Sequence, residues 1–114
     1  MRNKRIFLTF LTLFIIGCDG DGIRGENFED QMTREAMCVV ASERFLLYKE
    51  AERHRQHGLA SGKARFSVTS EINDFEKRIH SARLILGEMS KEYNAEFLRV
   101  QCDKAITVLE FESV

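Results

Sequence analysis

The segment EAERHRQH, residues 50–57, contains the side chains best suited to chemistry. Glu50, His54 and His57 are spaced at i, i+4 and i+7, which places them on one face of an α-helix. A carboxylate and two imidazoles are ligands that a zinc ion accepts. The spacing therefore predicts a candidate metal site, although the sequence shows no fourth ligand. The alternative is that basic side chains near a helix C-terminus interact with the helix dipole and face water.

The sequence shows no motif for nucleophilic or phosphoryl chemistry. No serine outside the first 17 residues lies in the glycine-flanked turn that activates a hydrolase serine. The GLASG segment, residues 58–62, lacks the lysine and the preceding strand of a phosphate-binding loop. We therefore expect a protein that is not an enzyme and that needs no cofactor.

The first residues have the pattern of an export signal. Arg2, Lys4 and Arg5 give a basic start, and residues 6–16 follow without a charge. A helix of this length, rising about 1.5 Å per residue, would span only about half of a ~30 Å hydrocarbon core. The apolar run fits a signal peptide better than a spanning helix. We therefore predict that residues 1–17 are a signal peptide.

The residues that follow the apolar run resemble the lipobox of bacterial lipoprotein precursors. Residues 15–18 read Ile-Ile-Gly-Cys, with isoleucines where the lipobox usually has leucine and a small or branched residue. The resemblance covers residues 1–19. It implies cleavage between Gly17 and Cys18, a diacylglycerol on the thiol of Cys18, and acylation of the new amino group.

The resemblance also implies a location. Asp19 directly follows the cysteine, and in enterobacterial lipoproteins an aspartate there is associated with retention at the inner membrane. Residues 18–27 begin with the lipidated cysteine and an Asp-Gly-Asp-Gly run, which predicts a hydrated tether. Two or three acyl chains anchor a protein firmly. We therefore expect the periplasmic face of the inner membrane, with the outer membrane as the alternative.

The charge balance of the mature chain narrows the choice of partners. The chain has 17 basic and 18 acidic residues, and its first 17 residues hold 3 of the basic ones. The mature chain therefore has 14 basic and 18 acidic residues, a formal net charge of −4. Nucleic-acid binding normally requires a clustered basic face. We therefore expect no nucleic-acid partner.

With Cys18 assigned to lipid, Cys38 and Cys102 remain as an even pair in an oxidising compartment. This arithmetic favours a disulfide between them. Pairing would also remove the remaining option for nucleophilic catalysis, a thiol of either cysteine acting with a histidine. A domain of roughly 90 residues forms a small hydrophobic core, so its stability is marginal without such a crosslink.

The pattern of apolar residues predicts helices throughout the mature chain, which contains no proline. We expect a first helix over residues 28–57 that ends at Gly58, with the GLASG segment as the turn. The second has the clearest helical spacing, and its expected core positions are Ile72, Phe75, Ile79, Ala82 and Leu86. The third should run from about Ser90 to Phe111 and present Leu98, Cys102, Ala105 and Leu109 on one face.

Three helices with short connections predict an all-α fold. We expect a small antiparallel bundle of about three helices, residues 28–114, after the N-terminal signal helix. In this arrangement the Cys38–Cys102 bridge would join the first helix to the third.

Four consecutive apolar side chains widen the apolar face of the first helix: Phe45, Leu46, Leu47 and Tyr48. They are either part of the core or a surface that receives a partner protein. We expect a membrane-anchored envelope lipoprotein that binds another envelope or secreted protein, as an accessory factor of a secretion or conjugation system. The alternative is an immunity protein or inhibitor that protects against a toxin or lytic enzyme, and a metal-binding domain is a third hypothesis.

Overall fold

The computed structural model describes residues 24–114, and this part of the chain folds into α-helices without a β-strand. The helices are α2 (Arg24–Arg44), α3 (Tyr48–Thr69), α4 (Phe75–Leu86), α5 (Lys91–Gln101) and α6 (Val108–Glu112). The predicted all-α fold is confirmed. The predictions for the signal peptide, Cys18 and Asp19 lie outside the described residues.

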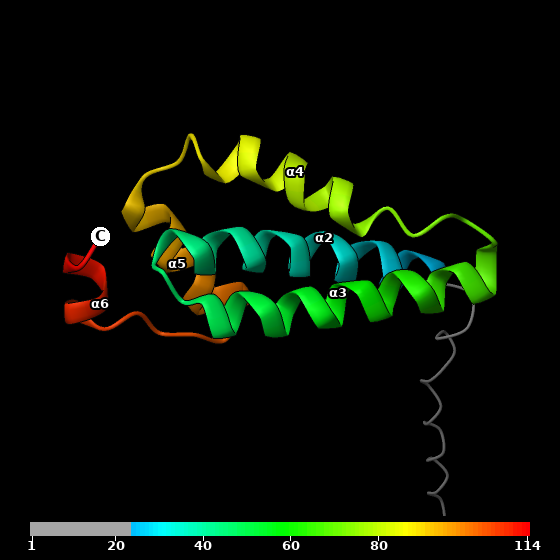
Figure 1. Cartoon of the computed structure of the whole chain (residues 1–114), viewed down its shortest axis with the longest axis horizontal. Helices are drawn as coiled ribbons and strands as arrows, with labels where there is room; N and C mark the ends of the chain where they lie inside the picture. The colour runs from blue at the N-terminus through cyan, green and yellow to red at the C-terminus, as the bar shows by residue number, and fades with distance from the viewer. Residues whose placement is uncertain (1–23) are drawn as a thin grey trace, which may run out of the picture.

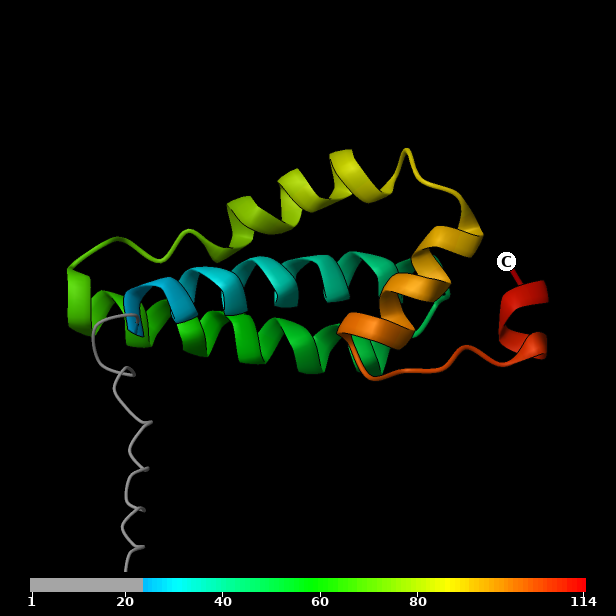
Figure 2. The same ribbon diagram turned by 180° about the vertical axis from the view of Figure 1, so that it is seen from behind.

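Helix α2 is the centre of the bundle. It packs against α3, α4 and α5, whereas α3 and α4 barely touch each other. Figures 1 and 2 show α3 running antiparallel beside α2, α4 along another side of α2, and α5 near the end of α2 that leads into α3. This position explains the wide apolar face of the first helix, whose buried members include Met32, Ala36, Val39, Val40 and Ala41. No helix in residues 24–114 is both long enough and apolar enough to cross a membrane.

The prediction of one long first helix over residues 28–57 is wrong, because the chain turns at residues 45–47. Leu46 adopts a left-handed conformation with φ of 60°. The amide of Leu47 donates to the carbonyl of Ser42 at 3.0 Å, and the amide of Leu46 donates to the carbonyl of Glu43 at 3.0 Å. These two bonds form a Schellman motif, which usually has glycine at the left-handed position. Leucine in that place left no turn signal in the sequence.

The GLASG segment is not a turn but the middle of α3. A Cβ atom on Gly58 would overlap the ring of Phe75, and one on Gly62 would overlap the side-chain amide of Asn73. Both glycines are buried, and they let the segment that leads into α4 lie directly on α3. Their role is therefore close packing rather than chain reversal.

Helix α4 begins at Phe75, later than predicted. The side-chain oxygen of Asn73 accepts from the amide of Phe75 at 3.1 Å, while the Asn73 amide donates to the carbonyl of Leu59 at 3.0 Å. Ile72 therefore stays outside the helix and is 79% exposed, so its predicted place in the core is wrong. The remaining predicted core positions of this helix are confirmed as buried: Phe75, Ile79, Ala82 and Leu86.

The predicted third helix is divided into α5 and α6. Asp103 has φ of 58°, which ends α5, and a capping box between Thr107 and Glu110 starts α6. Leu98 and Cys102 are buried as predicted, whereas Ala105 and Leu109 are exposed. The sulfur atoms of Cys38 and Cys102 lie 2.14 Å apart, at disulfide distance, and join α2 to the end of α5.

Four charged side chains hold together the end of the bundle where α2 begins. Arg65 of α3 is buried and pairs with Glu29 of α2 and with Asp74, the latter at 3.2 Å. Arg78 of α4 bonds the same two carboxylates, at 2.6 Å to Glu29 and 2.9 Å to Asp74. The four residues, which we call the Arg65 cluster, fix α3 and the start of α4 to α2.

Candidate functional site

The structure brings together two of the three residues in the predicted metal set. His54 on α3 is only 5% exposed, and its ring centroid lies 6.4 Å from that of the exposed His57. The carboxylate of Glu50 is instead bonded by Arg53, and this hydrogen bond lowers the pKa of Glu50. The carboxylate nearest to His54 belongs to Glu35 of α2, with 2.6 Å between Oε1 and the histidine Nδ1.

Sequence reasoning missed Glu35 because it treated residues 28–57 as one helix. On a continuous helix, residues 35 and 54 would lie about 28 Å apart along the axis. The turn at residues 45–47 folds α3 back along α2 and brings the two side chains into contact. The sequence signal for this contact would have been the turn itself, which no glycine marks.

The four residues of the predicted partner-binding face divide between the core and the surface. Phe45 is buried, and its ring centroid lies 6.0 Å from that of Phe111. Leu47 is half-buried and packs against the core. Leu46 and Tyr48 are 55% and 63% exposed. Phe45 and Leu47 thus belong to the core, whereas Leu46 and Tyr48 lie on the surface, where partner binding stays a prediction.

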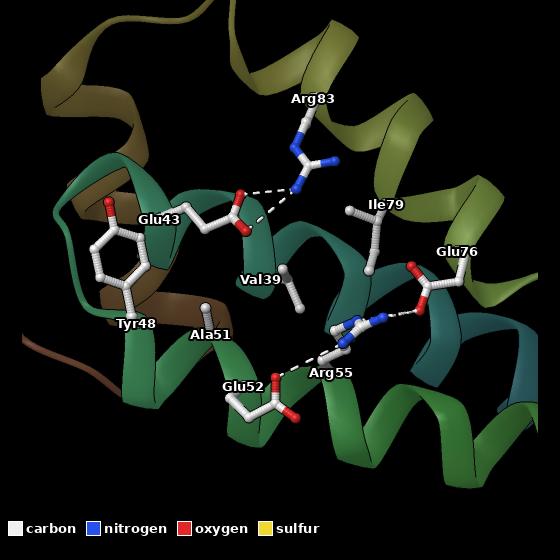
Figure 3. A pocket seen from close by; sticks show the side chains of 9 residues that line it. All are labelled: Val39, Glu43, Tyr48, Ala51, Glu52, Arg55, Glu76, Ile79 and Arg83. Carbon is white, nitrogen blue, oxygen red and sulfur yellow. Dashed lines mark hydrogen bonds and ion pairs between the residues drawn. The ribbon is translucent and has the colours of Figure 1, made fainter.

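A cleft of about 340 Å³ opens next to this turn, where α3 and α4 diverge over α2. Its apolar floor has one residue from each helix: Val39 from α2, Ala51 from α3 and Ile79 from α4. Figure 3 shows these three side chains between charged residues, with Tyr48 at one end. The cleft exists because both helices pack on α2 and hardly on each other.

The rim of the cleft consists of ion pairs that cross it. Arg83 of α4 pairs with Glu43 of α2 at 3.2 Å. Arg55 of α3 pairs with Glu76 of α4 at 2.6 Å and lies 3.8 Å from Glu52. These side chains are about one third to three fifths exposed, and ion pairs in contact with solvent contribute only about 0–1 kcal/mol each. A partner with suitable charges can therefore rearrange them at little cost.

The chemistry of the cleft suits binding. Its floor is apolar, although Val39, Ala51 and Ile79 are themselves buried, and its rim offers donors and acceptors of both charge signs. The side chains that line it include three carboxylates and two guanidinium groups, but no serine, cysteine or histidine: Val39, Glu43, Tyr48, Ala51, Glu52, Arg55, Glu76, Ile79 and Arg83. We therefore treat this cleft, together with the exposed Leu46, as the candidate functional site.

Comparisons of the chain with protein-family models, with curated proteins and with solved structures find no match.

Proposed function

We propose that the protein is a lipid-anchored, non-enzymatic envelope protein that binds another envelope or secreted protein through the α2–α3 turn and the adjoining cleft. The observation that carries the proposed binding surface is the exposed, left-handed conformation of Leu46. Its side chain is more than half exposed, and its backbone is left-handed. Glycine adopts this conformation without strain, whereas other residues pay about 1–2 kcal/mol. An exposed leucine at this strained position supports a role for the side chain outside the core.

The cleft supplies the rest of the proposed surface. Tyr48 lines the cleft and follows Leu46 by two residues, so the turn and the cleft are continuous. Aromatic and apolar anchors surrounded by polar groups are typical of the energetic centre of protein interfaces. The expected partner element therefore places an apolar side chain on the cleft floor and charged groups against the rim.

The position of the turn also agrees with an anchor at Cys18. The chain enters α2 at one end of the bundle, and the turn lies at the other end of that helix (Figure 1). The 21 residues of α2 correspond to a length of about 30 Å. A tether to the membrane would therefore leave the proposed binding surface on the side of the bundle away from the anchor.

The anchor is tested by labelling cells with palmitate. We expect label in the full chain and none in the Cys18→Ser variant, because the thiol that receives the diacylglycerol is removed. Cys38→Ser is the matched control and should retain the label. Unchanged labelling of Cys18→Ser would refute the lipid anchor.

The binding surface is tested by site-specific photocrosslinking in the cell envelope. A crosslinking amino acid at Leu46 or Tyr48 should capture one distinct protein, while the same group at Ile72 is the control, since Ile72 is exposed at the other end of α3. The captured partner identifies the role: a secretion or conjugation component favours an accessory factor, and a toxin or lytic enzyme favours an immunity protein. Equal capture from all three positions would overturn the proposed surface.

A further inference from the structure

The strongest feature outside the cleft is the group formed by Glu35, His54 and His57. One potential ligand atom from each residue lies within 4.8 Å of the others. Two of the three side chains come from α3 and the third from α2, so the tertiary fold itself assembles the set. From this arrangement we propose that the three residues bind a divalent transition-metal ion of the zinc class.

The ligand types and their spacing favour this ion. Two imidazoles and one carboxylate form a ligand set that zinc sites use, with a further position left for water. Ligand atoms around a tetrahedral zinc ion with bonds of about 2.0–2.1 Å lie about 3.3 Å apart. The present spacing therefore needs a closure of at most about 1.5 Å. His57 is exposed on α3, so rotation of its side chain can provide that closure without repacking the core.

The surroundings of His54 fit the role of the central ligand. An ionised carboxylate only accepts, so the 2.6 Å contact with Glu35 requires the hydrogen of the imidazole to be on Nδ1. Within the described residues, the buried Nε2 atom has no hydrogen-bond partner.

When zinc binds to Nδ1 of His54, the hydrogen of the imidazole is carried by Nε2 instead. Zinc at Nδ1 requires the neutral tautomer with its hydrogen on Nε2, which is not engaged elsewhere in residues 24–114. The imidazole then remains neutral, and the carboxylate of Glu35 exchanges a hydrogen bond for a metal bond.

The proposal is tested by calorimetric titration of the full chain in detergent with zinc chloride. Free thiols are first capped with iodoacetamide, so that they cannot act as ligands. We expect one zinc ion per chain and an increase in Tm, because an ion that binds only the folded state stabilises it. His57→Ala should lower the affinity by about tenfold or more, since even groups that only support a ligand contribute that much.

Two control variants separate this site from other sources of zinc affinity. His80→Ala removes an exposed histidine of α4. Glu50→Gln removes the carboxylate that the sequence alone predicted as a metal ligand. Both variants should bind zinc with the affinity of the wild type. The absence of zinc binding to the wild type would overturn the proposal. So would a His57→Ala variant with the affinity of His80→Ala, or a Glu50→Gln variant as weak as His57→Ala. Photocrosslinking at the cleft does not depend on this result, so the two proposals fail separately.

Discussion

Gly58 of α3 lies directly against the aromatic ring of Phe75, the first residue of α4. The contact is so close that a Cβ atom on Gly58 would overlap the Cε1 and Cζ atoms of the ring. Phe75 is completely buried and is the largest of the fully buried side chains. The missing side chain at position 58 therefore determines how closely α4 can begin against α3.

Gly58→Ala should destabilise the protein even though alanine favours helices. In an exposed helix interior, replacing glycine by alanine gains about 1 kcal/mol. Here the added methyl group meets a fully buried ring, and overpacking of this kind costs about 1–3 kcal/mol. We expect a lower urea midpoint than that of the wild type. Ala60→Gly, an exposed change in the same helix, controls for helix propensity, and a Gly58→Ala variant more stable than the wild type would contradict the packing role.

The sequence predicted the helical class and much of the core because these depend on local periodicity. The Phe75–Leu86 helix shows this most clearly, since four apolar positions at spacings of three and four are buried as expected. Glycine was the misleading signal. The same residue type ends helices and permits close packing, and only the position of Phe75 shows which role Gly58 has.

The candidate site and the division of the last predicted helix were harder to predict, because each depends on a left-handed turn that no glycine marks. Leu46 ends the first helix and brings Glu35 to His54, while Asp103 ends α5 after Cys102. One boundary had a sequence signal that the prediction of an undivided third helix overlooked: Thr107 and Glu110 have the spacing of a capping box, which starts α6. The cleft also depends on the divergence of α3 and α4, and a pattern of apolar residues does not encode that divergence.

Loss of the Cys38–Cys102 bridge should lower the free energy of unfolding substantially. The two cysteines are 64 positions apart in the chain. Chain-entropy arithmetic for a closed loop of this size gives about 4 kcal/mol. We therefore expect a much lower urea midpoint after reduction, or in the Cys38→Ala, Cys102→Ala double variant. Cys18→Ala is the control for loss of a cysteine outside the bridge, and it should keep the wild-type urea midpoint. Unfolding curves that coincide with and without reductant would refute a stabilising bridge.

Leu46→Gly should make the folded chain more stable while weakening partner capture. Glycine relieves the strain of the left-handed conformation, an effect of about 1–2 kcal/mol that the greater freedom of glycine in the unfolded chain partly offsets. We expect a net increase in Tm. Ile72→Gly is the control, because Ile72 is exposed but lies outside the left-handed region, so only the unfavourable contribution applies. A drop in Tm for both variants would show that Leu46 is not strained.

Acid should destabilise the protein through the Arg65 cluster. Hydrogen bonds from Arg78 lower the pKa of Glu29 and the pKa of Asp74 below their ordinary values. A carboxyl with a depressed pKa takes up its proton more readily in the unfolded chain. Its contribution to stability is therefore complete above about pH 5 and is lost as the pH falls through about 4 and below.

The Arg78→Gln variant tests this origin of the acid sensitivity. It should be less stable than the wild type at pH 7, and its free energy of unfolding should fall less steeply between about pH 5 and pH 3, because the two carboxyls no longer differ as much between the folded and unfolded chains. Lys77→Gln removes the same charge from an exposed position on the same helix and should keep the wild-type slope. Glu50 and Glu110 also have lowered pKa values, so a shallower slope remains in Arg78→Gln. Urea unfolding measured at each pH gives the slopes, and identical slopes for Arg78→Gln and Lys77→Gln would exclude the cluster as the source.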